Sequence, residues 1–91
     1  MKVQLRTGFW QLTEGELTLE ADILRLRTPT AEIFSIPLKE LRSFSLYRLQ
    51  QFRLETADAA WEGSFFSQAD SSALLQQLCG RSRNLQVLFH S

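Results

Sequence analysis

Two residues that could support catalysis occur once each in this sequence of 91 residues: Cys79 and His90. A cysteine nucleophile needs a neighbouring base that keeps it as the thiolate, and His90 is the imidazole available for that role. Cys79, however, falls on the apolar stripe of a predicted helix, where a small core residue is expected. His90 lies in a tail beyond that helix, and nothing in the sequence argues that the tail folds back. We therefore expect no catalytic site, no metal site and no cofactor.

The acidic residues are spread along the chain. Glu20 and Asp22 share one predicted turn, but catalysis by paired carboxylates requires burial, which a polar hairpin tip rarely provides. The sequence also lacks a glycine-rich loop of the kind that holds phosphates. We therefore expect a protein that is not an enzyme.

Basic residues are balanced by acidic ones. Ten Lys and Arg face ten Asp and Glu, and neither sign forms a long block. Binding to nucleic acid requires clustered positive charge, so it is not expected. Arg25 and Arg27 in one predicted strand, and Arg42 in another, are the residues that could face a lipid head group. Because each basic residue near an anionic membrane contributes about 1 kcal/mol, these three predict at most weak binding to a membrane surface.

The sequence also indicates a compartment. No segment approaches the roughly 18–20 apolar residues that cross a bilayer. The first six residues alternate like a strand and lack the apolar core of a signal peptide. A single cysteine excludes an internal disulfide. These features predict a cytoplasmic protein without a transmembrane segment.

Apolar and polar residues alternate with a period of two in seven short segments, which predicts β-strands with one buried face. The segments are residues 2–12, 15–20, 24–27, 34–36, 42–47, 51–56 and 60–66. Turns are predicted at residues 13–15, 20–22, 28–30, 48–50 and 57–59, and a single helical turn at residues 38–41. Seven short strands at regular spacing are typical of a barrel or a sandwich.

After the strands, the pattern changes to that of one amphipathic helix over residues 68–79. Leu74 and Leu78 lie four residues apart and define its apolar face. Ser67 is placed to cap the first turn with its hydroxyl, and Gly80 is placed to end the helix. We expect this helix to cover an open end of the β structure.

In this order of elements, the chain resembles the pleckstrin-homology-like (PH-like) superfold, and within it the GRAM domains and the small bacterial PH-like domains. The resemblance rests on residues 15–19 (GELTL), 22–26 (DILRL) and 36–41 (IPLKEL), and it spans about residues 3–80. It implies a barrel of about seven antiparallel strands capped by one C-terminal amphipathic helix. Residues 1–91 are thus expected to form a single PH-like domain with a tail at residues 81–91.

The resemblance implies a binding module, because such domains mostly bind phosphoinositides, peptides or other proteins. Phosphoinositide-binding relatives set several Lys and Arg around the first hairpin, whereas residues 13–15 (TEG) of this chain are acidic. We therefore expect a small non-catalytic cytoplasmic module for interaction or assembly, whose partner is another protein or a second copy. The alternative is weak binding of a lipid head group or membrane surface through the three arginines.

The resemblance also indicates where a partner would bind. PH-like barrels often leave a gap between the fifth strand and the helix, where related domains add a partner strand. In this chain that edge is expected at residues 43–47, with Ser43, Ser45 and Tyr47 outward.

Two aromatic residues extend this candidate surface. Phe9 and Phe66 each sit beside a core-facing aromatic residue, so on regular strands they point away from the core. A bulge at Gly8 would instead bury Phe9.

The tail has a strand pattern of its own. Leu85, Val87 and Phe89 alternate, which predicts an extra C-terminal strand with one apolar face. Left in water, each side chain would forfeit roughly 1.5–3 kcal/mol of burial, so the tail is expected to dock. It could dock on the chain's own β structure or on the open edge of a neighbouring subunit. We favour the second arrangement, an exchanged strand that makes a symmetric homodimer.

Overall fold

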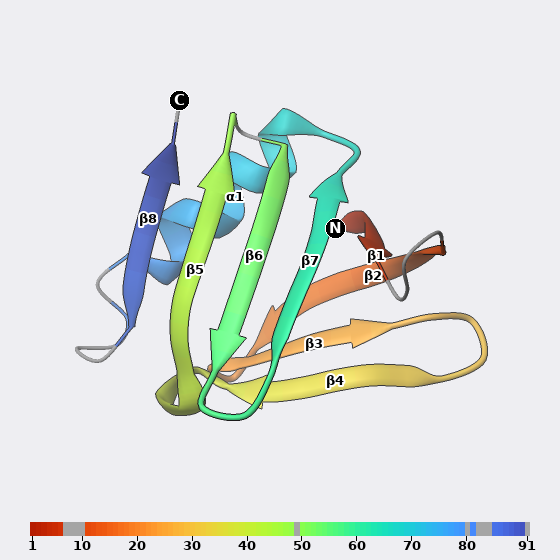
Figure 1. The fold of residues 1–91 in the computed structure, drawn as a ribbon, viewed down its shortest axis with the longest axis horizontal. Coiled ribbons are helices and arrows are strands. Elements are labelled where there is room, and N and C mark those ends of the chain that lie inside the picture. The colour runs from red at the N-terminus through yellow and green to blue at the C-terminus, as the bar shows by residue number, and fades with distance from the viewer. Residues whose placement is uncertain (7–10, 49, 80, 82–84, 91) are drawn as a thin grey trace.

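The computed structural model describes residues 1–6, 11–48, 50–79, 81 and 85–90 (Figure 1). Across these residues the fold is mainly β, with one α-helix and one short 3-10 helix. The strands are β1 (Lys2–Arg6), β2 (Leu12–Glu20), β3 (Ile23–Arg27), β4 (Glu32–Pro37), β5 (Leu41–Tyr47), β6 (Gln51–Thr56), β7 (Ala60–Phe65) and β8 (Gln86–His90). The 3-10 helix η1 (Leu38–Glu40) joins β4 to β5, and the helix α1 (Gln68–Leu78) follows β7.

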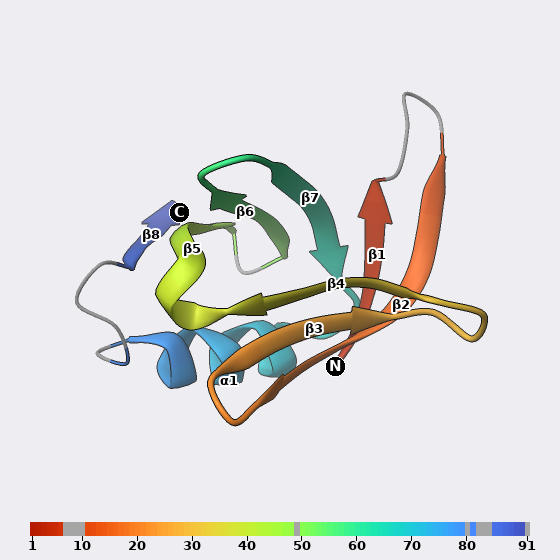
Figure 2. The same ribbon diagram turned by 90° about the horizontal axis from the view of Figure 1, so that it is seen from below.

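All eight strands belong to one sheet, in the order β4-β3-β2-β1-β7-β6-β5-β8. Neighbouring strands are antiparallel, except that β8 runs parallel to β5. The sheet bends, so that β2, β3 and β4 lie across from β5, β6 and β7 (Figure 2). It does not close into the predicted barrel, because β4 continues into η1 without pairing with β5, and β4 and β8 remain as its two ends.

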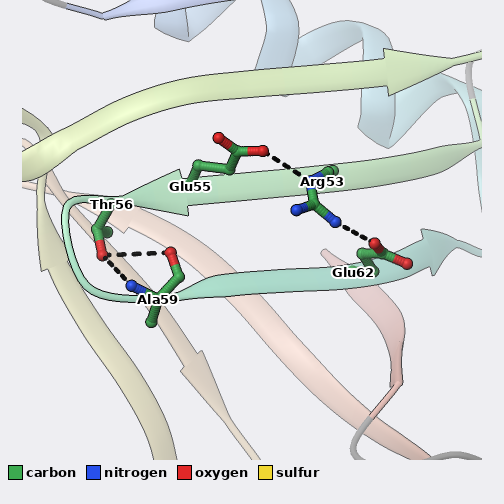
Figure 3. Close-up of polar contacts among 5 residues, drawn as sticks. All are labelled: Arg53, Glu55, Thr56, Ala59 and Glu62. Atoms are coloured by element: carbon green, nitrogen blue, oxygen red, sulfur yellow. Dashed lines mark hydrogen bonds and ion pairs between the residues drawn. The ribbon is translucent and has the colours of Figure 1, made fainter.

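Local turn chemistry explains several of the strand ends. The turn between β2 and β3 has positive φ at both Ala21 (51°) and Asp22 (62°), which matches the twist of a two-residue hairpin. In the turn after β6, the N–H of Thr56 donates to the carbonyl of Ala59 at 2.9 Å. The Thr56 hydroxyl accepts from the Ala59 N–H at 3.2 Å (Figure 3). Thr28 makes the same pair of contacts with Ala31 before β4. The turns predicted at these three places are confirmed.

The core lies on the inner face of the bent sheet. Phe52 is central to it, with its ring 6.4 Å from that of Phe44 and 5.2 Å from that of Phe65. From α1, Leu74 and Leu78 are fully buried in the same cluster, which confirms the predicted apolar face of the helix. In Figure 1, α1 lies behind β5 and β6. The other buried apolar residues are Val3, Leu5, Leu17, Leu24, Leu26, Phe34, Ile36, Leu38, Leu41, Leu46 and Leu54.

The turn predicted at residues 13–15 is wrong. These residues belong to β2, where Thr13 pairs with Leu5 and Gly15 with Val3. Gly15 serves close packing, since a Cβ there would lie 3.0 Å from the carbonyl oxygen of Arg27. β1 ends at Arg6 and β2 begins at Leu12, and the predicted bulge at Gly8 lies outside the described residues.

Two predictions about α1 are also wrong. Ser67 precedes the helix, but its hydroxyl makes no capping hydrogen bond; its carbonyl instead accepts from the Ser71 N–H at 3.2 Å. Cys79 is exposed, because α1 ends at Leu78 and Cys79 has extended backbone angles (φ −61°, ψ 123°) that leave the helical period. The predicted stop at Gly80 lies outside the described residues.

Candidate functional site

The open sheet has two edge strands, β4 and β8, and only one of them carries the features that protect an edge. Natural edge strands are commonly protected from pairing by charged side chains, proline and irregular ladders. β4 begins with Glu32 and ends with Pro37, which has no N–H to donate, and its pairing with β3 shifts register between Leu26 and Arg27. The β4 edge is therefore poorly suited to accept another strand.

β8 has none of these protections. Residues Gln86–His90 (QVLFH) contain no Lys, Arg, Asp, Glu or Pro. One side of β8 pairs in parallel with β5, from Ser43 opposite Gln86 to Tyr47 opposite His90. Its other side pairs with no strand among the described residues, and β8 is the leftmost strand in Figure 1. We call this side the β8 edge, and it is the candidate functional site.

The two faces of β8 differ. Val87 lies beside Phe44 and Phe89 beside Leu46, so both belong to the inner face of the sheet. Val87 packs against the core, whereas the side chain of Phe89 remains 52% exposed. Leu88 lies beside Ser45 on the outer face. The predicted tail strand is thus confirmed, and it docks on β5 of its own chain; pairing with a second subunit stays a prediction.

The structure overturns the prediction that residues 43–47 form a free edge. β5 lies between β6 and β8, because docking the apolar tail covers the edge that β5 would otherwise expose. Ser43 and Tyr47 do face outward, and Tyr47 is exposed. Ser45 also faces outward but is only 6% exposed, since it lies between Leu88 and Arg53 in the cross-strand row.

The other predicted surface residues do not join the β8 edge. Phe66 is exposed, as predicted, but it follows β7, which two strands separate from β8. Leu85, which directly precedes β8, packs against the core. Phe9 lies outside the described residues.

The three arginines of the lipid alternative do not share one surface. Arg27 on β3 lies 3.9 Å from Glu32. Its neighbour Arg25 is half-buried, and its Nε has no hydrogen-bond partner among the described residues. Arg42, at the start of β5, instead lines a separate cavity that neither Arg25 nor Arg27 reaches. The structure therefore provides no single basic patch from these residues.

The cavity beside Arg42 has a volume of about 910 Å³ and opens between η1 and the turn after β6. Its apolar floor includes Trp61, whose ring lies 5.0 Å from that of Phe34. Its charged residues are two cations and two anions: Lys39, Arg42, Glu40 and Asp58. Because these charges balance, the cavity does not select an ionic ligand by its net charge.

A cluster of charged residues lies on the outer face of β6 and β7 (Figure 3). Two of its members, Arg53 and Glu62, share a cross-strand row with Ser45 and Leu88. The Arg53 Nε donates to Glu55 Oε1 at 2.7 Å, and the Arg53 Nη1 donates to Glu62 Oε1 on β7. These hydrogen bonds, the one to Glu55 first, raise the pKa of Arg53 above its ordinary value. The other oxygen of Glu62 lies 3.9 Å from Arg6. The sequence shows only that basic and acidic residues balance, because the Arg53–Glu62 pair depends on the register of β6 and β7.

We expect the Arg53–Glu62 pair to show measurable coupling that salt weakens. In a double-mutant cycle with Arg53→Met and Glu62→Gln, the free energies of unfolding should be non-additive at low salt and closer to additive in 1 M NaCl, where screening is short-ranged. The matched control is Arg27→Met with Glu32→Gln, a longer contact at 3.9 Å, which should couple less. Equal coupling in both cycles, or coupling that salt leaves unchanged, would contradict the expectation.

Comparisons with known proteins do not add a functional residue. No protein-family model matches the sequence, and no curated protein matches it at a significant level. In the described part of the chain, no helix has the length and apolar character needed to span a membrane. The same residues contain no group of three or more His, Cys, Asp or Glu placed to hold a metal ion.

Proposed function

We propose that this protein is a small, non-catalytic, cytoplasmic module of PH-like fold that serves interaction or assembly through its β8 edge. The order of the elements supports the PH-like assignment. Seven strands form antiparallel pairs and precede the helix α1, and β1 pairs with both β2 and β7, so it joins the two halves of the bent sheet. Where the sheet remains open, β8 extends it beyond β5.

The observation that carries the proposal is the contrast between the two edges. An edge strand presents unpaired N–H and C=O groups that can pair with another chain. β4 is protected by Glu32, Pro37 and a register shift, whereas β8 has neither charge nor proline and exposes Phe89. Addition of a partner strand would satisfy the β8 backbone and cover this side chain. The proposed partner is therefore a β-strand of a protein.

The placement of the chemically reactive groups supports a non-catalytic role. Cys79 is exposed at the end of α1, outside any buried site. Glu62 and Glu32, which lie on strands, are partly exposed and take part in surface ion pairs with arginines. Catalysis by carboxylates draws on burial and like-charge neighbours to shift their pKa, and these two residues face cations instead.

Site-specific photocrosslinking in intact cells tests the proposal. With p-benzoylphenylalanine in place of Phe89, a close match in shape at an exposed position, we expect covalent adducts whose partner peptide can be mapped by mass spectrometry. The control is the same residue in place of Ile33, an exposed position on β4. The absence of adducts at position 89, or the same adducts at both positions, would contradict a role for the β8 edge.

A further inference from the structure

The β8 edge is complementary to itself. If Gln86–His90 pairs antiparallel with the same segment of a second copy, one register matches all five residues. In that register Gln86 faces His90, Val87 faces Phe89, and Leu88 faces Leu88 of the second copy. The arrangement has a two-fold axis at Leu88, as a closed dimer with one shared surface requires.

The side chains on each face suit this register. Val87 and Phe89 both belong to the inner face, beside Phe44 and Leu46. In the paired dimer, Phe89 of each copy would lie opposite Val87 of the other, and pairs of aromatic and β-branched residues are favourable across antiparallel strands. The exposed ring of Phe89 would gain a neighbour on its open side. On the outer face, the two Leu88 side chains would meet at the axis.

The charge distribution favours a second copy over a highly charged partner. The whole chain has ten basic and ten acidic residues, so two copies have no net charge that would drive them apart. The strand itself contains no Lys, Arg, Asp or Glu, so self-pairing places no like charges opposite each other. For the same reason, a strongly acidic or basic strand would gain no complementary contact along β8.

We propose that two copies of this chain associate by antiparallel β8–β8 pairing about a two-fold axis at Leu88, which joins their two eight-stranded sheets into one continuous sheet. This inference rests on the proposed function, because it names the partner of the β8 edge. It differs from the exchange of tails, because each β8 keeps its place on β5 of its own chain.

Opposite charges at position 88 test the two-fold axis directly. The wild type should have a solution mass of twice 10.5 kDa by light scattering. Leu88→Lys and Leu88→Glu should each weaken dimerisation by about tenfold or more, because each variant sets like charges face to face. An equimolar mixture of the two variants should recover the doubled mass. Ile33→Lys on β4 is the control and should leave the mass of the dimer unchanged.

Circular dichroism shows whether a charge at position 88 unfolds β8. If it does, a second variant tests the same axis without a charge. Leu88→Cys in a Cys79→Ser background places one small thiol at the axis. Mild oxidation should link two copies through this thiol, whereas Ile33→Cys in the same background should not form the linked dimer. A folded Leu88→Cys protein that stays unlinked would overturn the proposed axis.

The outcomes separate this inference from the proposed function. A monomeric wild type with crosslinks from position 89 to a different protein overturns the self-pairing and leaves the interaction role standing. A dimer that neither charge variant weakens also overturns the self-pairing. Exchanged tails would give this result, because Leu88 of one copy would then not face Leu88 of the other. A monomeric wild type without crosslinks overturns both.

Discussion

Replacing Gly63 by alanine is expected to lower the free energy of unfolding by about 3 kcal/mol, at the upper end of overpacking effects. A Cβ at this position would lie 2.6 Å from the carbonyl oxygen of Gln4 and 2.6 Å from Cζ of Phe52. The Gln4 oxygen belongs to β1, which pairs with β7 here, so it cannot withdraw without disturbing the sheet. Gly63→Val adds two further methyl groups and should leave little folded protein, because small domains have only about 5–15 kcal/mol of stability.

Urea unfolding followed by circular dichroism measures this effect, and Gly15→Ala is its control. A Cβ at residue 15 meets the Arg27 carbonyl oxygen at 3.0 Å and Leu26 Cδ1 at 3.2 Å, so smaller adjustments relieve it and the loss should be about 1 kcal/mol. Adding Phe52→Leu to Gly63→Ala should restore only part of the free energy of unfolding that Gly63→Ala loses, because the contact with Gln4 remains. If both alanine variants lose the same free energy of unfolding, β1 and β7 move apart more easily than their geometry indicates, and the prediction is wrong.

Truncating Phe52 to alanine is expected to cost about 3–5 kcal/mol, as for other large aromatic residues removed from a core. Phe52 is 2% exposed, and its ring lies 6.4 Å from that of Phe44 and 5.2 Å from that of Phe65. Its removal leaves both rings with a void that the paired strands around them cannot close, since β6 is held by β5 and β7.

The matched control for this prediction is Phe66→Ala, which removes the same side chain from a position that is 56% exposed. It should change stability by no more than about 0.5 kcal/mol, as surface substitutions usually do. Thermal and urea unfolding of the two variants give the comparison. Similar losses for both would mean that Phe66 is buried in the protein in solution, for instance by a partner, or that the core relaxes around residue 52.

Features that depend on neighbouring residues could be predicted from the sequence. The alternation through Leu24 and Leu26, between two turns rich in polar residues, predicted β3, and the Thr56–Ala59 turn followed from its composition. The apolar face of α1 followed from the spacing of Leu74 and Leu78. In each case the local pattern and the tertiary packing require the same conformation, so the sequence alone was sufficient.

Features that depend on distant partners could not be predicted. Glycine is common in turns, so the sequence predicted a turn at Gly15. Only the approach of the Arg27 carbonyl shows that Gly15 serves close packing. The alternation of Leu85, Val87 and Phe89 predicted a strand but not its pairing with β5, which removed the expected edge and buried Ser45. The β8 edge itself left one sequence signal, the absence of charge and proline from residues 85–89, but its meaning required the strand order.

The parallel pairing of β8 with β5 has a consequence for the order in which the protein folds. Antiparallel neighbours such as β2 and β3 are joined by a short turn, whereas Ser43 and Gln86 are partners across the whole segment from β6 through α1. Such a contact has high sequence separation, and the entropy of closing this loop must be overcome before it forms. We expect β8 to dock after the β5–β6 hairpin has formed, so that β5 has an unpaired edge until the tail arrives. Until then, chains at high concentration could aggregate through the β5 edge, and docking of the tail removes that edge.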